Sequence, residues 1–332
     1  MNEVEKDYRK NPALNYSLLK QVADNPSQIQ DKKDISEYPS VKRGDILDMM
    51  FEDKEAVFKK YQYFDGEIPT AMSLQAADKM IEYCKVIGEA PSAKLGLEIA
   101  RENDLWKTSK DDTILKKFDD NFFSYVNFYL DTDKIIVTKD ILDDVEEAYN
   151  SILTHEHTKE IFDFTKRKVI YQQPIYTTYK YEKDGKLKEE KIKVLVDIIS
   201  IDEDRKIIYP YDTKFLTDYS VFSFPKRFLQ MYYYIQSGLY TYAINKWAKE
   251  NYPDYKVVNY NFIAISTKNL SLPIVFDAFD YTIPSRIGFE INGRHYPGIN
   301  QLIEDYRWHE ENDLWSYRRE LYENKGVIKL KL

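Results

Sequence analysis

Two apolar segments joined by a short charged turn constrain the fold of this chain more than any other feature. The first segment covers residues 194–199, the second runs from 207 to Lys214, and the turn occupies 202–205. Strands that are apolar on both faces are usually buried inside a sheet. The pattern therefore predicts a central hairpin. Asp197 interrupts its first strand and needs a partner charge or a metal there.

The turn also fixes which residues of the hairpin face each other. If its centre lies between Asp204 and Arg205, then Asp197 stands opposite Asp212, with Cβ atoms about 4.5–5.5 Å apart. Lys214 follows Asp212 by two residues and shares its face of the strand. Two carboxylates at this separation repel each other unless a proton or a cation lies between them. The alternative is a surface hairpin with a charged cluster, which the apolar flanks argue against.

This group of side chains predicts a kind of chemistry. Carboxylate oxygens are the ligands that Mg²⁺ and Mn²⁺ prefer. A lysine beside them can position a water or stabilise the charge of a phosphate. Asp197, Asp212 and Lys214 are therefore the minimum set for metal-assisted hydrolysis of a phosphodiester, and they are the candidate catalytic residues.

The remaining sequence divides into a helical half and a half with strands. Residues 1–160 are mainly helical in pattern, and 161–332 alternate between strands and helices. This order indicates an α/β (α+β) fold with a mixed central β-sheet flanked by helices. No linker interrupts the chain, so residues 1–332 are expected to form one domain with insertions. The expected helices are 17–22, 44–58, 71–87, 91–106, 138–153, 225–250 and 299–323, and the expected strands are 169–181, 188–201, 206–212, 257–266 and 272–279.

Composition and charge narrow the setting of the protein. The 332 residues are 43% hydrophobic, with one cysteine, Cys84, and the charged start MNEVEKDYRKNP is unlike a secretory signal. No apolar run approaches the roughly 18 residues that cross a bilayer. We therefore expect a cytoplasmic protein without a membrane partner. The net charge of −8 argues mildly against binding nucleic acid, but the local field in a groove matters more.

Several motifs together resemble the PD-(D/E)xK nuclease superfamily. The core is D-x(14)-D-T-K, from Asp197 to Lys214, and Gln236 with Tyr240 forms the Q-x-x-x-Y signature of the RecB-like branch. Further segments are similar to exodeoxyribonuclease VIII (RecE) of phages and prophages. These are N-Y-S-L-L-K at 15–20 with N-P at 25–26, R-G-D-I-L-D at 43–48, N-F-I-A-I at 261–265, and 306–315, which ends in tryptophan.

The resemblance implies a role for each matching residue. Asp197, Asp212 and the Thr213 carbonyl would bind Mg²⁺ or Mn²⁺, and Lys214 would orient the attacking water. Gln236 and Tyr240 would support the site and touch the DNA backbone. Asp48 stands where the family has His or Glu as a further metal ligand, with Asp45 and Glu52 as alternatives on the same helix. Gln172 and Gln173 stand where some relatives carry Glu.

Three functions remain open at this stage. The first is a metal-dependent exonuclease that degrades linear double-stranded DNA from a free end. Its expected partners are a single-strand annealing protein and further copies of the chain, in phage-type recombination or repair. The second is a structure-specific or restriction-like endonuclease. The third, from another class, is a catalytically inactive DNA-binding or assembly protein, which the presence of all three core residues disfavours.

Overall fold

The computed structural model describes residues 3–31, 39–69 and 71–327. The chain divides into two compact units. Unit 1 comprises Met1–Glu52 and Asp144–Leu332, and unit 2 comprises Asp53–Asp143. Unit 2 is therefore one continuous insertion in the sequence of unit 1. The assignment of 1–332 to a single nuclease domain stays a prediction.

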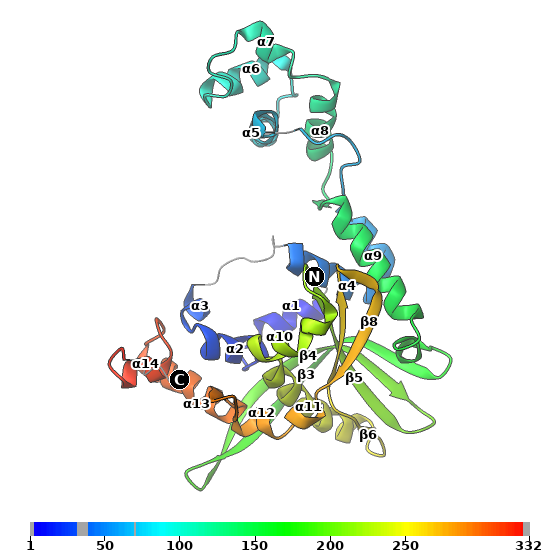
Figure 1. Ribbon diagram of the computed structural model, residues 1–332, viewed down its shortest axis with the longest axis vertical. Helices are drawn as coiled ribbons and strands as arrows, with labels where there is room; N and C mark the ends of the chain where they lie inside the picture. Colours follow the sequence, from blue (N-terminus) through cyan, green and yellow to red (C-terminus); the bar gives the residue numbers. More distant parts are fainter. Residues whose placement is uncertain (1–2, 32–38, 70, 328–332) are drawn as a thin grey trace. The chain divides into compact units, whose positions relative to one another are not determined.

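Unit 1 is built on a mixed sheet with flanking helices, which confirms the expected fold class (Figure 1). Its strand order is β3-β4-β5-β7-β8, and β6 pairs with β5 on the same edge as β7. β5 runs parallel to β6 and β7, and the other pairs are antiparallel. The strands of this sheet are β3 (Arg167–Lys183), β4 (Lys186–Asp202), β5 (Ile207–Leu216), β6 (Lys256–Val257), β7 (Asn261–Ser266) and β8 (Asn269–Asp277).

The β3–β4 hairpin is a long arm, drawn in green in Figure 1. Its pairing continues to Lys183 and Lys186 at the tip, whereas β4 pairs with β5 only from Ile198 to Asp202. The β4–β5 register is the predicted one, because Ile198 pairs with Tyr211 and Asp202 pairs with Ile207.

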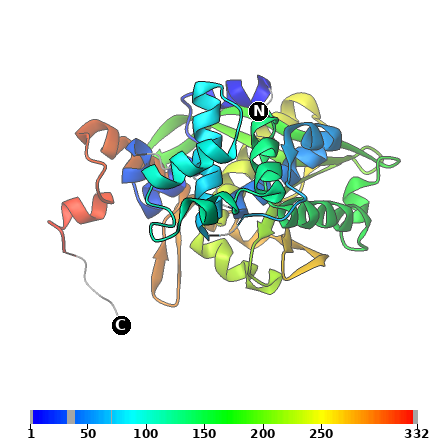
Figure 2. The ribbon, with the colours of Figure 1, turned by 90° about the horizontal axis from the view of Figure 1, so that it is seen from above.

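Helix α11 (Tyr233–Asn251) packs against the sheet and is buried along most of its length. Tyr242 on this helix donates from its hydroxyl to the Thr178 carbonyl of β3 over 3.0 Å. The other helices of unit 1 are α1 (Glu3–Lys10), α2 (Tyr16–Asp24), α3 (Ser27–Gln30), η1 (Lys159–Phe162), η2 (Val221–Ser223), α10 (Phe224–Gln230), η3 (Phe279–Tyr281), α12 (Pro284–Ile287), α13 (Ile299–Asn312) and α14 (Arg319–Glu323). A separate hairpin, orange in Figure 2, joins β9 (Phe289–Ile291) to β10 (Arg294–Tyr296).

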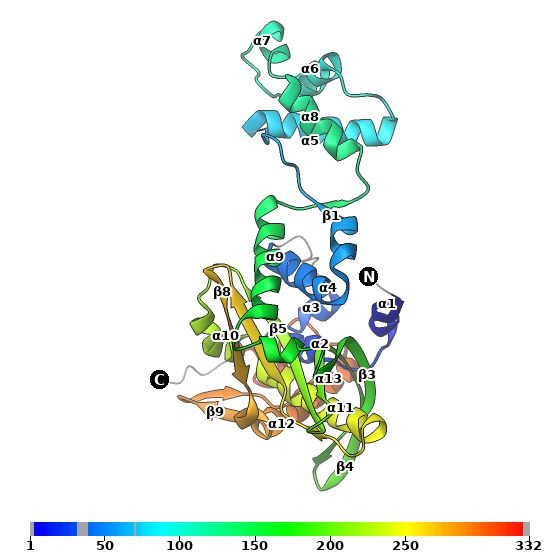
Figure 3. The same cartoon turned by 90° about the vertical axis from the view of Figure 1, so that its right-hand side faces the viewer.

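Unit 2 is helical and has its own apolar core. Helices α5 and α8 pack together, and α6 packs against α5 (Figure 3). Its elements are β1 (Tyr61–Gln62), α5 (Ala71–Ile87), α6 (Ala93–Glu102), α7 (Asp111–Leu115), α8 (Asp120–Leu130) and β2 (Ile135–Ile136). Helices α4 (Pro39–Lys60) and α9 (Lys139–Thr154) cross the boundaries between the units, and Asp53 at one boundary has a non-helical backbone.

Several expected elements are divided in the structure. The expected helix 225–250 is α10 and α11, separated at Tyr232, whose φ of 58° is left-handed. The expected helix 299–323 stops at Asn312, because Asp313 is also left-handed, and resumes as α14. The expected strand 257–266 is β6 and β7, and the helix expected at 91–106 is α6, which ends at Glu102. Among the described residues, no helix is long and apolar enough to span a membrane.

Gly238 tests the packing of α11 on its neighbours. A Cβ at this position would collide with Ser285, which is fully buried, and would lie 3.2 Å from Ile299 Cδ1. We expect Gly238→Ala to lower the free energy of unfolding by about 1–3 kcal/mol through overpacking. Gly44 in α4 has open space around it, so Gly44→Ala should instead raise stability by about 0.5–1 kcal/mol. Urea unfolding followed by tryptophan fluorescence compares the two, and effects of the same sign would contradict the packing.

Candidate active site

The candidate site lies where β4 and β5 separate. Their pairing ends at Ile198 and Tyr211, so the next two residues in register, Asp197 and Asp212, stand at the mouth of the opening. Beyond that point Asp212 pairs with Phe262 of β7. The Asp197 carboxylate takes the place of a strand neighbour, because its Oδ2 accepts the N–H of Thr213 over 3.4 Å. The two aspartates that were predicted to oppose each other therefore lie across a gap between the strands, and their carboxyl groups line that gap.

Asp212 is the most enclosed residue of the site, with 2% of its surface exposed. Its Oδ1 accepts a hydrogen bond from Gln236 Nε2 and another, over 3.4 Å, from the Tyr260 hydroxyl. Its Oδ2 forms an ion pair with the Lys214 ammonium. Three partners from α11, β5 and the segment before β7 thus hold one buried carboxylate, which reduces the cost of burying it.

Asp48 reaches the site from α4. The Thr213 hydroxyl donates to Asp48 Oδ1 over 2.6 Å, which ties this helix to β5. Asp48 is half-buried, whereas Asp45 and Glu52 are exposed. Of Asp45, Asp48 and Glu52, Asp48 is thus the carboxylate that the structure shows bonded to β5, the strand that carries Asp212.

The Thr213 carbonyl points into the same opening. Residues of a strand alternate between its two edges. The carbonyls of Ile208 and Leu216 accept N–H groups on the β6–β7 side, so even-numbered residues of β5 face that edge. Thr213 faces the β4 edge, as its N–H bond to Asp197 shows. Because β4 has left the ladder there, this carbonyl is directed at the gap rather than at a strand partner.

Burial and neighbouring carboxyl groups raise the pKa of Asp197 and of Asp48. Burial, followed by the charges of Asp212 and Asp48, raises the pKa of Asp197 well above its usual range, and a hydrogen bond with Asp212 adds to the effect. Burial raises the pKa of Asp48 to about 7, against the opposing hydrogen bond from Thr213. Burial disfavours the Lys214 ammonium, but Asp212, Tyr233 and Asp197 outweigh it and raise its pKa. Asp197 and Asp48 thus favour their protonated forms unless a cation takes the place of the proton.

The donor atoms of the site are oxygens, which are the ligands that a hard divalent cation prefers. Within the described ranges, no group of three or more His, Cys, Asp and Glu side chains is arranged to hold a metal. Mg²⁺, however, commonly binds through one or two carboxylates and completes its shell with water and substrate phosphates. Asp197, Asp212 and the Thr213 carbonyl offer such a partial set, and Asp48 is linked to it through Thr213.

A cleft of about 690 Å³ reaches Asp48 and Asp197. One wall is the segment from α1 to α2, which is fastened to β4. Leu14 forms a parallel bridge with Ile192, and the buried Lys193 ammonium donates to the carbonyls of Tyr8 and Asn11 over 2.8 and 2.6 Å. The charged and aromatic residues that line the cleft are Tyr8, Arg9, Lys10, Tyr16, Asp45, Asp48, Lys193, Asp197 and Tyr240.

Gln236 and Tyr240, the residues of the Q-x-x-x-Y motif, lie on the buried face of α11. Gln236 is buried and bonds Asp212, and Tyr240 is buried on the same face of α11 and lines the cleft. Tyr240 packs edge-on against Tyr260, with ring centroids 5.0 Å apart. Both side chains therefore touch the site, and contact with DNA stays a prediction.

Two supporting residues were not assigned roles from the sequence. Tyr260 bonds Asp212, but nothing in the sequence relates it to a residue 48 positions earlier. Gln172 has a left-handed backbone, with φ of 46°, and its Nε2 lies 3.4 Å from Asp197 Oδ1. In the sequence, Gln172 stood out only as an amide at a position where some members of the superfamily that the motifs resemble carry Glu.

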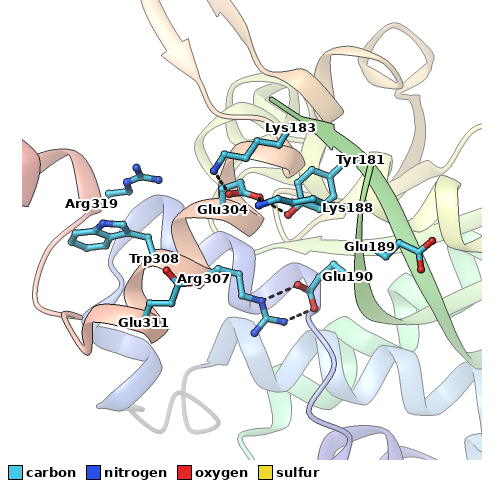
Figure 4. A pocket seen from close by; sticks show the side chains of 10 residues that line it. All are labelled: Tyr181, Lys183, Lys188, Glu189, Glu190, Glu304, Arg307, Trp308, Glu311 and Arg319. Carbon is cyan, nitrogen blue, oxygen red and sulfur yellow. Dashed lines mark hydrogen bonds and ion pairs between the residues drawn. The ribbon is translucent and has the colours of Figure 1, made fainter. Parts of the chain in front are cut away.

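A second pocket, of about 430 Å³, lies away from these carboxylates, between the β3–β4 arm and α13 (Figure 4). Its cations are neutralised. Lys183 and Lys188 both pair with Glu304, and Arg307 pairs with Glu190. These bonds fasten α13 to the hairpin and leave little positive charge for a ligand.

Comparison with known proteins adds no assignment. No protein-family model matches the chain, and no curated protein matches it significantly.

The raised pKa of Asp48 predicts a dependence of stability on pH. Between its ordinary value of 3.8 and about 7, the folded metal-free protein binds the proton more tightly than the unfolded chain does. The free energy of unfolding should therefore fall as the pH rises through this window. Asp48→Asn removes this contribution. The free energy of unfolding of the variant should therefore rise relative to that of the wild type as the pH increases from about 5 to about 8.

Urea unfolding in excess chelator measures this difference. Asp204→Asn, at an exposed position of the β4–β5 turn, is the control and should follow the wild type. A constant gap between wild type and Asp48→Asn across the window would contradict a raised pKa at Asp48.

Proposed function

We propose that the protein is a magnesium-dependent deoxyribonuclease that hydrolyses phosphodiester bonds from the ends of linear double-stranded DNA. One observation carries the proposal. Where β4 and β5 separate, two aspartates converge with a lysine that is ion-paired to one of them, and a buried glutamine holds that same aspartate. The D-x(14)-D-T-K and Q-x-x-x-Y motifs, which are far apart in the sequence, thus meet in one site.

The residues divide the work of such a hydrolysis. Asp197, Asp212 and the Thr213 carbonyl would hold Mg²⁺, which when bound would neutralise phosphate charge and supply an activated water. Gln236 and Tyr260 hold the Asp212 carboxylate in place. Lys214 remains protonated beside Asp212, and it orients the attacking water or the phosphate.

The size of the cleft favours action on one strand. Its volume of about 690 Å³ is within the range of pockets that enclose a small ligand. A short stretch of a single strand can occupy it, whereas a duplex cannot enter whole. A strand separated from its complement at a DNA end is therefore the substrate that suits the cleft. A single-strand annealing protein and further copies of this chain are the partners that an enzyme of this kind would have.

Incubation of linear and covalently closed plasmid with Mg²⁺ tests the proposal directly. Loss of the linear form alone supports the exonuclease. Nicking or linearisation of the closed form would show the endonuclease instead. DNA binding without cleavage in Mg²⁺ or Mn²⁺ would support the inactive DNA-binding protein.

The first activity prediction concerns the two core aspartates. Asp197→Asn and Asp212→Asn should each reduce cleavage by at least about a hundredfold, because each removes a carboxylate that would hold the cation. Ca²⁺ should not replace Mg²⁺, since it takes more ligands at longer distances. Release of acid-soluble nucleotides is the measurement, with Asp204→Asn as the control that keeps wild-type activity. Cleavage in excess chelator would refute the metal requirement.

The second activity prediction concerns Lys214. Lys214→Ala should lose more activity than Lys214→Arg, because arginine keeps the charge but replaces a compact ammonium by a planar fork. DNA binding in Ca²⁺, measured by fluorescence anisotropy, should change little in either variant, since phosphate contacts are spread over many groups. Normal cleavage by Lys214→Ala would make the motif a coincidence. Loss of binding in proportion to cleavage would make Lys214 a phosphate anchor only.

A further inference from the structure

A pocket of about 320 Å³ lies between α11 and the segment from Thr282 to Arg286. Asn245, which lines this pocket, comes nine residues, or about two and a half turns, after Gln236 on α11. The pocket is therefore on the face of the helix opposite to the one that bonds Asp212. The polar side chains that line it are Thr241, Asn245, Lys246, Lys249, Thr282 and Arg286.

The close packing of α12 on α11 brings Arg286 to this pocket. Gly238 of α11 has no side chain, and a Cβ there would collide with Ser285, the residue before Arg286. The Arg286 guanidinium lies 6.0 Å from the centroid of the Tyr242 ring, and the Lys246 ammonium lies 5.8 Å from the same centroid. The hydroxyl of Tyr242 anchors this ring on β3. Two cations from different helices thus meet at one fixed aromatic ring.

The pocket carries positive charge that no carboxylate neutralises. Lys246, Lys249 and Arg286 line it, and none of its lining residues is Asp or Glu. Within the part of the chain that the structure describes, none of these three cations forms a salt bridge. The cations that meet Glu190 and Glu304 in the pocket of Figure 4 are, by contrast, paired. The pocket behind α11 is therefore the one whose charge is left for a ligand.

The hydrogen-bond donors of the pocket suit a ligand that is rich in acceptor oxygens. Arg286 Nε donates to the Tyr179 hydroxyl over 3.3 Å, which leaves the two outer nitrogens of its fork for a ligand. Asn245 donates one N–H of its amide to the Thr241 carbonyl over 2.8 Å and has a second N–H to offer. A phosphate matches both the arginine fork and the lysine ammonium groups in charge and in acceptors.

We propose that this pocket is a binding site for a phosphate group, held by Lys246, Lys249 and Arg286 and separate from the candidate active site. Its volume is at the lower end of those that enclose small ligands, so a mononucleotide would fill it. The phosphate belongs to a free nucleotide or to a DNA strand that passes along α11. The choice of these two sources rests on the proposed function, whereas the anion site itself does not.

Inorganic phosphate tests the site without DNA or metal. Isothermal titration calorimetry in chelator, at constant ionic strength, should show that the wild type binds phosphate. Lys246→Gln and Arg286→Gln should each raise the Kd for phosphate about tenfold, which corresponds to about 1.4 kcal/mol. Arg286→Lys should raise it less, because it keeps the charge. Lys226→Gln, which removes an exposed charge outside the pocket, is the control and should bind as the wild type does. No binding by the wild type, or equal binding by all four variants, would overturn the proposal.

Lys249→Gln separates an effect on binding from an effect on stability. Arg286→Gln also removes the bond to the Tyr179 hydroxyl, so its melting temperature is expected to fall. Lys249→Gln removes an exposed ammonium, so it should leave the melting temperature unchanged while still raising the Kd for phosphate. If Lys246→Gln and Lys249→Gln both bind phosphate as Lys226→Gln does, the proposal is overturned.

A nucleoside 5′-monophosphate and a duplex with hydroxyl ends distinguish the two sources of the phosphate. Weaker binding of the monophosphate alone by Lys246→Gln and Arg286→Gln assigns the pocket to a free nucleotide. Weaker binding of the duplex in Ca²⁺, with the slope of log Kd against log salt lowered by about one, assigns it to a phosphodiester of a strand. If both variants bind both ligands as the wild type does, the phosphate site is refuted.

Failure of this site and failure of the proposed function give different results. A wild type that binds phosphate through Lys246 and Arg286 but does not cleave DNA would refute the nuclease and leave the anion site standing. A wild type that cleaves linear DNA, with pocket variants that bind phosphate as Lys226→Gln does, would refute the anion site alone.

Discussion

The hydrogen bond between the Thr213 N–H and the Asp197 carboxylate is the constraint on which the site depends. It occupies the position at which a β4 carbonyl would continue the ladder with β5. Because this side chain replaces a strand neighbour, β4 and β5 part at Ile198 and Tyr211. The Thr213 carbonyl is then left facing the gap. On the other edge of β4, Gln172 takes a left-handed backbone opposite the same aspartate, so the disturbance is confined to one level of the sheet.

The enclosure of Asp212 explains why so much of unit 1 converges on one point. A carboxylate that is 2% exposed is costly unless it is paired and hydrogen-bonded. Its partners come from α11, from β5 and from the segment before β7. The buried face of α11 therefore cannot be wholly apolar, and Gln236 is the residue of that face that bonds Asp212. The packing of α11 on the sheet thus adds to the pairing within the site in offsetting the free-energy cost of burying this carboxylate.

The sequence predicts the local parts of this arrangement and misses the distant ones. The β4–β5 register follows from a charged turn and two apolar flanks, all within about twenty residues, and the structure confirms it. The breaks at Tyr232 and Asp313 were missed, because both residues adopt left-handed backbones that no glycine or proline announces. Tyr260 and Gln172 were given no role, since their value arises only when separate strands meet.

The distribution of charge matters for the proposed function, because an acidic protein would have to bind a polyanionic substrate. The net charge of −8 counts every aspartate as ionised, yet burial raises the pKa of Asp48 and Asp197. Many cationic side chains are also ion-paired within the fold, as Lys183 and Lys188 are with Glu304. A phosphate of the proposed substrate would be attracted where cations lack such partners. The local field beside the carboxyl groups, rather than the total charge of the protein, would therefore decide whether a nucleic-acid strand binds.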